Sequence, residues 1–272
     1  MSIVISGSFV VTDSTPEYPV TADHPVIGWH NIVAATNIVA TYEDPDYPAS
    51  NLATALTHEE WRSEDDGEQF LTLTTGYVDD IDYVGVAKHN WGSDQIAVSL
   101  EGFIDGDWVE LVAERLLTDD SPLLFRFTAQ SLSQVRIRLQ APTDVLPRAA
   151  VVYVGKLLTL ERKIWNDHVP IPHGRRTEIQ NGRSESGNFL GRIVLGAWRE
   201  SVIPLSLLSP GWVREYAQEF LVAAATTPFF FGWRPETYPA EVGYCWTTED
   251  PIPAPKSPAN VIAFDLKVSG VV

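Results

Sequence analysis

The sequence predicts an all-β protein of two β-sandwich domains, the second smaller and carrying one α-helix. Three observations predict it. Short segments of period-two alternation recur through the first part of the chain, turn-forming Gly, Asp, Asn and Pro separate them, and one helical stripe lies nearer the C-terminus. We expect an N-terminal arm at 1–24, a first sandwich at 25–162 and a smaller β domain at 163–272.

The N-terminal arm begins with a β-rich run and continues into a polar stretch broken by Pro16 and Pro19. Such a stretch has few apolar residues to bury in a core of its own. We interpret it as an arm that packs on a neighbouring molecule.

The first domain alternates most clearly at 135–139, where Arg136 and Arg138 share the face opposite three apolar residues. Segments 71–74 and 96–100 follow the same pattern. An Asp105-Gly106 turn before Trp108 predicts a hairpin. The region therefore predicts antiparallel strands with one face in a core.

The second domain contains predicted strands at 189–197 and 262–268 and one helix at 209–225 between them. Ser209 suits the N-cap, Pro210 suits the first helical position, and Pro228 prevents continuation. The apolar stripe consists of Trp212, Tyr216, Phe220 and Ala224. A helix with one such stripe is expected to cover a sheet.

Composition excludes several classes of partner. Acidic residues number 36 against 19 basic ones, and the formal charge of -17 repels phosphate backbones and anionic lipid, so we expect no nucleic-acid partner. No apolar run of about 18 residues occurs, and the first residues lack the basic region of a signal peptide, so we expect no membrane insertion and synthesis into a cytoplasm. Cys245 is the only cysteine, which excludes an intramolecular disulfide, and we expect it to be a buried hydrophobe.

A degenerate pattern covers about a third of the chain. Its segments are Tyr47-Pro48-Ala49-Ser50-Asn51-Leu52, Thr57 to Ser63, Gln69-Phe70-Leu71-Thr72-Leu73, Val84-Gly85-Val86, Ile96 to Leu100, Trp108-Val109-Glu110-Leu111 and Val135-Arg136-Ile137-Arg138. The pattern resembles the discoidin-like, coagulation-factor type C family, which implies a jelly-roll sandwich that binds carbohydrate. It departs from the family in two places, because the terminus-linking disulfide cannot form and Glu101-Gly102-Phe103-Ile104 displaces the usual serine.

The second domain has the order turn, strand, sheet-covering helix, aromatic strand and closing strand. The turn is Asn181 to Gly187, and the aromatic strand follows Thr227-Pro228 as Phe229-Phe230-Phe231-Gly232-Trp233. This order resembles the short β domains of tailed-phage distal tail and tail-tip proteins. The resemblance implies a ring-forming virion component that carries a carbohydrate-binding module on its outside.

Two predicted connections carry the residue types that sugar sites use, which are aromatic faces and planar polar side chains. One connection contains His58, Trp61 and Arg62, and the other contains His89, Asn90 and Trp91. Connections of a sandwich collect at its two ends, so these residues can converge on one carbohydrate site. The alternative is that Trp61 is a core residue and Trp91 a loop anchor.

An acidic run offers oxygen ligands of the kind that calcium takes. It comprises Glu59, Glu60, Glu64, Asp65, Asp66 and Glu68, with Asp79, Asp80 and Asp82 beyond. Acidic residues interleaved with turn formers are more often a solvated loop. We therefore expect no metal site and no cofactor, with calcium as the alternative.

Catalytic motifs are missing. His58-Glu59-Glu60-Trp61-Arg62 lacks the second histidine of a zinc-protease helix, and Gly182 to Gly187 lacks the spacing of a nucleophile elbow. So many acids occur that any carboxylate pair could be nominated for glycoside hydrolysis. We expect no enzyme; the alternatives are an accessory module or enzyme acting on polysaccharide, and a purely architectural tail protein without ligand.

Arg175, Arg176, Arg183 and Arg192 concentrate positive charge in an acidic chain. We expect them to contact an acidic surface of a neighbouring subunit, the alternative being ordinary surface charges.

Together these observations predict a structural component of a phage tail tip, in the distal tail region, whose sandwich attaches to host-surface polysaccharide. Its expected partners are other tail proteins and further copies of itself in a homo-oligomeric ring. Its expected location is the virion tail, assembled in the host cytoplasm.

Overall fold

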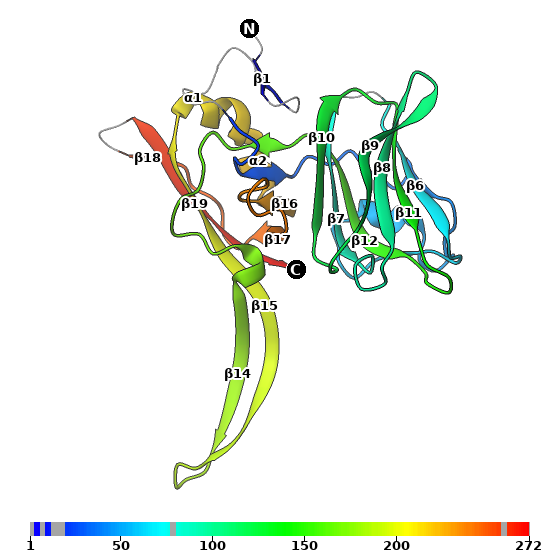
Figure 1. Cartoon of the computed structure of the whole chain (residues 1–272). Coiled ribbons are helices and arrows are strands. Elements are labelled where there is room, and N and C mark those ends of the chain that lie inside the picture. The colour runs from blue at the N-terminus through cyan, green and yellow to red at the C-terminus, as the bar shows by residue number, and fades with distance from the viewer. Residues whose placement is uncertain (1–2, 6–8, 12–19, 77–79, 257–259, 272) are drawn as a thin grey trace.

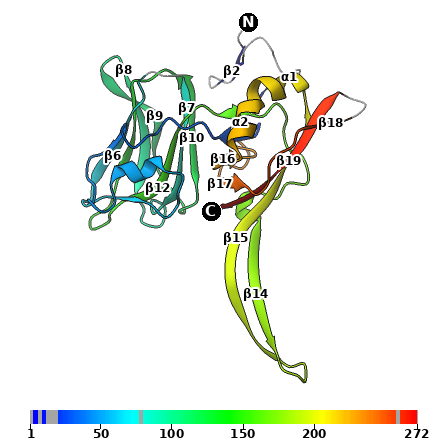
Figure 2. The same cartoon turned by 180° about the vertical axis from the view of Figure 1, so that it is seen from behind.

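The computed structural model describes residues 3–5, 9–11, 20–76, 80–256 and 260–271. The protein is mostly β-structure, as predicted, and the described sheets are antiparallel. A two-sheet sandwich lies on one side, a third sheet covered by a helix lies on the other, and a long hairpin projects from the third sheet (Figures 1 and 2).

The sandwich consists of a five-stranded and a four-stranded sheet. The strands are β4 (Ile38–Ala40), β5 (Trp61–Arg62), β6 (Glu68–Thr74), β7 (Ile81–His89), β8 (Ala97–Ile104), β9 (Asp107–Leu116), β10 (Leu123–Gln130), β11 (Gln134–Gln140) and β12 (Arg148–Gly155). One sheet has the order β4-β6-β11-β8-β9 and the other β10-β7-β12-β5. A 3-10 helix, Ala49–Ala53, precedes β5. The predicted strands at 71–74 and 96–100 are therefore present as parts of β6 and β8.

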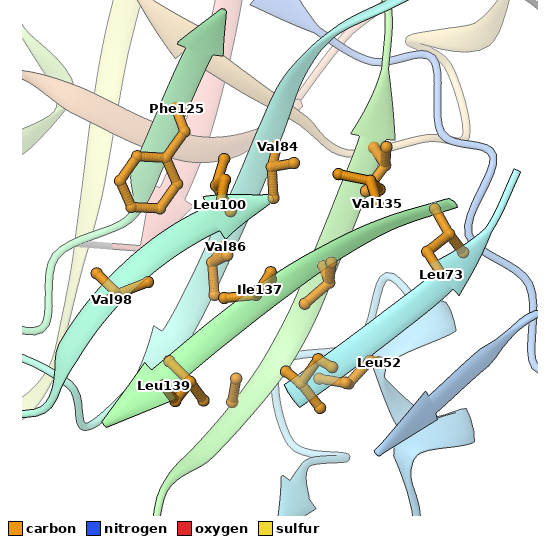
Figure 3. Close-up of a cluster of buried hydrophobic side chains, with 14 of the residues drawn as sticks. Leu52, Leu73, Val84, Val86, Val98, Leu100, Phe125, Val135, Ile137 and Leu139 are labelled. Carbon is orange, nitrogen blue, oxygen red and sulfur yellow. The ribbon is translucent and has the colours of Figure 1, made fainter. Parts of the chain in front are cut away.

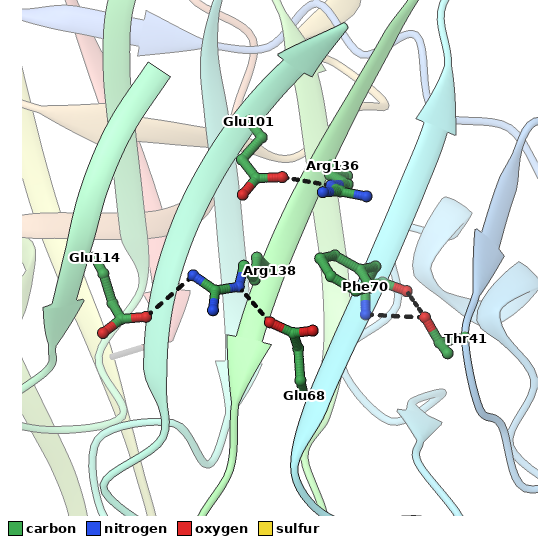
Figure 4. A network of polar contacts seen from close by, with 7 residues as sticks. All are labelled: Thr41, Glu68, Phe70, Glu101, Glu114, Arg136 and Arg138. Carbon is green, nitrogen blue, oxygen red and sulfur yellow. Dashed lines mark hydrogen bonds and ion pairs between the residues drawn. The ribbon is translucent and has the colours of Figure 1, made fainter. Parts of the chain in front are cut away.

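Apolar side chains from both sheets meet between them, including Leu73, Val86, Leu100 and Ile137 (Figure 3). The alternation predicted for β11 is confirmed, because Val135, Ile137 and Leu139 are buried whereas both arginines point outward. On the outer face Arg136 pairs with Glu101 at 2.5 Å, and Arg138 pairs with Glu68 at 2.8 Å and Glu114 at 3.4 Å (Figure 4).

The hairpin between β8 and β9 turns at Asp105 and Gly106, whose φ angles are 53° and 97°. Two positive φ values in a two-residue loop define the turn type that matches the twist of flanking strands. The predicted Asp-Gly hairpin is confirmed.

The third sheet has the order β13-β3-β16-β17-β19-β15-β14, with β18 beside β19. Its strands are β3 (Val26–Gly28), β13 (Leu158–Thr159), β14 (Arg175–Arg183), β15 (Phe189–Leu208), β16 (Phe229–Gly232), β17 (Val242–Thr247), β18 (Ala254–Lys256) and β19 (Val261–Val271). A 3-10 turn, Ile171–His173, precedes β14. The predicted strands at 189–197 and 262–268 lie within β15 and β19.

The sandwich is an insertion in the third sheet, which differs from the predicted boundaries at 25 and 162. Strand β3 pairs with both β13 and β16, so the residues before and after the sandwich belong to the third sheet. The predicted second domain is thus discontinuous in sequence. Its sheet does not close a separate two-sheet sandwich, since a helix covers one face and the first sandwich the other.

The helix runs through α1 (Pro210–Trp212), a π-helical turn η3 (Val213–Ala217) and α2 (Gln218–Ala223). The predicted N-cap is confirmed, because Ser209 Oγ accepts a hydrogen bond from the Trp212 amide at 3.2 Å. The helix ends two residues earlier than the predicted 225. Trp212 and Phe220 pack on β15, β16 and β19 in one buried cluster, which also contains Cys245. Cys245 is fully buried, and burial raises the pKa of its thiol well above the ordinary value.

The opposite face of the third sheet packs on β7 and β12 of the sandwich. Phe229 and Phe231 belong to the helix-side cluster, whereas Phe230 lies against Tyr153 at 5.5 Å between ring centroids. A Cβ atom at Gly85 would come within 2.6 Å of the Phe230 ring. The absence of a side chain at Gly85 therefore allows the two sheets to approach each other closely.

The hairpin arm, defined as β14 with the part of β15 that pairs with it (175–199), extends beyond the rest of the protein (Figure 1). It exposes several apolar side chains, namely Ile179, Phe189, Leu190, Ile193, Val194, Leu195 and Trp198. Five arginines and two glutamates make it the basic segment of an acidic chain.

Of the predicted N-terminal arm, β1 (Ile3–Ile5) and β2 (Phe9–Val11) form an antiparallel pair. The proline-broken stretch at 12–19 lies outside the described residues. No helix in the described part of the chain combines the length and apolar character needed to cross a membrane.

Candidate functional site

Two predicted site segments meet at one end of the sandwich. Ala149, near the start of β12, pairs with Trp61 on one side and His89 on the other. The connections around 58–62 and 89–91 therefore flank the same short stretch of β12. His58 lies on the connection before β5 and is exposed.

The two tryptophans of this set form part of the core. Trp61 and Trp91 are each 0% exposed. The indole nitrogen of Trp61 donates to the Tyr42 carbonyl at 3.2 Å, and the Trp91 ring lies 5.0 Å from the His89 ring. Neither indole face is open to a sugar ring, so the structure gives these residues the core and anchor roles that stood as the alternative.

His89 and Asn90 are also buried, at 6% and 4% exposure. The Trp91 amide donates to Nδ1 of His89, so the proton of the neutral ring lies on Nε2, which donates to the Ser121 carbonyl at 2.9 Å. Burial lowers the pKa of His89 and favours this neutral form. His89 thus fixes the loop that follows β7.

Asn90 uses both ends of its amide within the protein. Its nitrogen donates to Asp94 at 2.6 Å and to the Leu146 carbonyl at 2.9 Å, and its oxygen accepts from the Arg148 amide at 2.9 Å. This side chain braces two loops against each other and has little capacity left for a ligand.

Arg62 is the predicted residue that remains open to solvent and also has a fixed geometry. Its guanidinium carbon lies 3.8 Å from the centre of the Tyr47 ring, and Nε donates to Glu60 at 2.6 Å. The Arg62 side chain is 41% exposed and that of Glu60 is 20% exposed. The hydrogen bond with Glu60 raises the pKa of Arg62, so the guanidinium stays charged.

Several residues at this end of the sandwich were not among the predicted site residues. Tyr47 belongs to the family pattern only, yet its carbonyl accepts from the Arg62 amide at 3.1 Å and holds the two residues together. Arg148 is the β12 partner of Arg62 in the strand pairing, and Arg148 and Leu146 are both exposed. We define the Arg62 site as Tyr47, Glu60, Arg62, Leu146 and Arg148. The sequence contained no local signal for it, because its members come from three stretches of the chain, at 47, 60–62 and 146–148.

The acidic run is distributed over several structural contacts. Glu68 pairs with Arg138, and Asp66 accepts from the Asp144 amide at 2.6 Å. Within the described ranges, no three His, Cys, Asp or Glu side chains are grouped so that they could hold a metal ion. Asp79 lies outside the described residues.

Asp82 is buried at the junction between the sandwich and the third sheet. Its carboxylate accepts from the Leu157 amide at 2.8 Å, just before β13. Burial raises its pKa to about 7, against the opposing charges of Arg126 and Lys156. This is a perturbed carboxyl whose hydrogen-bond partner is a backbone amide of the junction.

The four arginines predicted as assembly contacts all lie on the hairpin arm. Arg176 pairs with Glu200 at 3.1 Å, and Arg192 donates to Asn181 at 2.9 Å. Arg175 and Arg183 make no side-chain hydrogen bond or ion pair with the described residues. Arg175 and Arg176 also line a groove of ≈ 600 Å³ at the base of the arm.

No protein-family profile matches the chain, and no curated protein matches its sequence. Several similar solved structures are carbohydrate-binding modules. One is a family 32 module from Clostridium perfringens in complex with GalNAc-β-1,3-galactose (16% identity, 46% of this chain, 99% of that one, TM-score 0.39).

Two further structures are similar over the same share of the chain. The family 32 module of NanJ from C. perfringens, in complex with galactose, is 14% identical over 46% of this chain and 97% of that one, with a TM-score of 0.39. A chitosan-binding module from Paenibacillus sp. IK-5 is 18% identical over 46% of this chain and 98% of that one, with a TM-score of 0.38. At these scores the fold assignment depends on the strand pairing described above.

Proposed function

We propose that this protein is a carbohydrate-binding structural component of a phage tail tip, carried in the virion as a ring of identical subunits. The carbohydrate part depends most on one observation, which is the guanidinium of Arg62 held over the Tyr47 ring by Glu60 at an exposed end of the sandwich. The discoidin-like sequence pattern supports the same assignment. The fold class by itself would not, because one fold serves many functions.

The Arg62 site has the groups that a sugar needs. The guanidinium offers planar donors, Glu60 offers acceptor oxygens, and Leu146 offers an apolar edge. Residues 25–162 contain 22 acidic and 9 basic residues, a net charge of -13 that disfavours anionic saccharides. The expected ligand is therefore a neutral or amino sugar at the surface of a host cell.

A glycan array with matched variants tests this site. Arg62→Ala removes the donors and is expected to weaken binding by about tenfold or more, the scale of hydrogen bonds to a charged group. Arg138→Ala is the control, because Arg138 also pairs with a glutamate but lies on the outer face of the sheet. The proposal would be refuted if both variants lost saccharide binding equally, or if the unaltered protein bound no saccharide.

The assembly part depends on the hairpin arm. A monomer in water seldom exposes seven large apolar side chains along one segment, and such surfaces usually bury themselves in a partner. The arm is basic and the sandwich acidic, so the complementary surface for one copy's arm is the sandwich of the next copy. Arg175 and Arg183, which lack partners within the described chain, would then meet carboxylates across the contact.

Light scattering of the purified protein tests this part. We expect an oligomer whose mass falls toward that of one chain when Leu190 and Ile193 are both changed to Ser. Ile252→Ser is the control, because Ile252 is at least as exposed, at 77% against 67% and 62%, but lies outside the arm. A strict monomer that also fails to bind isolated tail proteins would overturn both the ring and the tail-tip assignment.

A further inference from the structure

A second aromatic surface lies on the third-sheet side of the protein, away from the Arg62 site. Trp165, on the loop between β13 and β14, is 75% exposed. That is the largest exposed fraction of any aromatic side chain in the described chain. Placing an indole in water forgoes the burial that this side chain ordinarily gains, so the position calls for an explanation.

The ring of Trp165 is the outer member of a stacked column. The Arg234 guanidinium carbon lies 5.0 Å from the centroid of Trp165 and 5.0 Å from that of Trp233. Trp233 in turn stacks on Tyr238, with centroids 5.3 Å apart and planes 8° apart. Arg234 therefore supports one face of Trp165, and the exposure of Trp165 leaves the other face open.

The loop that carries Trp165 is held at both ends. Ile164 and Ile171 are buried in the cluster beneath the third sheet. Between them, the ring of His168 bonds to the Val202 carbonyl at 2.9 Å and meets the Trp233 ring at 5.6 Å. A loop anchored in this way loses little conformational entropy when a ligand binds.

Two planar polar side chains follow Trp165 directly. The amide nitrogen of Asn166 donates to the carboxylate of Asp167 at 2.9 Å, and both residues are exposed. Each keeps free acceptor capacity, and Asn166 keeps one further N–H donor. An open indole face beside an amide and a carboxylate is the combination that recognises a sugar ring by its apolar side and its hydroxyls together.

We propose that this Trp165 surface, made of Trp165, Asn166, Asp167 and Arg234, is a second saccharide-binding site for a neutral pyranose. The sugar ring stacks on the open face of Trp165, and the side chains of Asn166 and Asp167 bind its hydroxyl groups. The positive charge of Arg234 and the negative charge of Asp167 offset each other, which favours a neutral ligand over a charged one. The site does not require the Arg62 site to be functional. With two sites on one subunit, a single polysaccharide chain can be held at two points.

The test uses the full chain labelled with 5-fluorotryptophan, so that each tryptophan gives its own fluorine NMR signal. Trp165→Phe identifies the Trp165 signal by its disappearance. Neutral, amino and acidic oligosaccharides from a glycan array are then titrated into the labelled protein. A neutral saccharide is expected to shift the Trp165 signal, and Trp165→Ala is expected to weaken binding at this site by about tenfold.

Two further variants distinguish binding at the Trp165 surface from binding elsewhere on the protein. Trp246→Ala, at an exposed tryptophan on β17, is expected to leave the titration unchanged. Arg62→Ala is expected to leave the shift of the Trp165 signal in place while it reduces the total binding. If no saccharide shifts the Trp165 signal, or if Trp165→Ala changes only the oligomer mass, the second site is refuted while the Arg62 site can stand.

Discussion

The sandwich and the hairpin arm consist of similar strands but place their apolar residues in opposite environments. In the sandwich, alternate side chains enter a shared core and the outward arginines of β11 pair with neighbouring glutamates. In the arm, Phe189 and Leu190 are 65% and 67% exposed, and Arg183 has no partner in the described chain. The apolar residues of the sandwich are thus buried within one copy, whereas those of the arm stay exposed, as the proposed contact between copies requires.

The largest expected effect compares an aromatic residue from each region. Trp91→Ala leaves a cavity in the sandwich and is expected to lower the free energy of unfolding by about 3–5 kcal/mol. Phe189→Ala on the arm is expected to change it by less than about 0.5 kcal/mol in dilute protein. Urea unfolding followed by circular dichroism measures both. A comparable loss in Phe189→Ala would mean that the arm belongs to the fold of the single chain.

An intermediate effect concerns the buried carboxyl of Asp82. Because its pKa in the folded protein is raised to about 7 from an ordinary 3.8, folding favours the protonated form. The stability that this protonated carboxyl contributes is therefore full below the ordinary pKa of 3.8. It is lost as the pH rises from there through about 7, by about 1.4 kcal/mol of unfolding free energy per pH unit.

Asp82→Asn is expected to flatten this decline, since the amide oxygen can still accept from Leu157. Unfolding is measured at pH 5, 6 and 7, with Asp144→Asn as the control at an exposed carboxyl. An unchanged pH profile in Asp82→Asn would show that other groups determine the stability of the junction.

The smallest expected effect compares a paired arginine with an unpaired one. Arg138→Gln breaks two exposed ion pairs and is expected to cost less than about 1 kcal/mol of stability, a loss that shrinks at high salt. Arg175→Gln is expected to leave the stability of the single chain unchanged and to weaken self-association instead. A loss of single-chain stability in Arg175→Gln would contradict the assignment of this arginine to the interface.

Much of the fold could be predicted because its signals are local. The alternation of β11, the Asp105-Gly106 turn and the Ser209 cap each depend on neighbouring residues, and all three are confirmed. The assignment of β3 and β13 to the third sheet could not be predicted in the same way. Alternation indicates which face of a strand is apolar, but not which sheet the strand joins.

The candidate sites were harder to predict, because exposure depends on distant residues. Trp91 and Trp165 both lie on loops, yet one is fully buried and the other is 75% exposed. The sequence distinguishes them poorly, since tryptophan serves cores and surfaces alike. The two loops meet at Ala149, but their buried members belong to the core, and Tyr47 and Arg62 form the surface of the candidate site.

The insertion of the sandwich between β3 and β13 has an evolutionary consequence. Because these strands are hydrogen-bonded neighbours, the excursion starts and finishes at almost the same point, and a different module can be exchanged there without rerouting the remaining chain. The replacement must fit Phe230, however, by offering a gap like the one at Gly85. Exchange of whole modules at this point is therefore limited sterically by one phenylalanine.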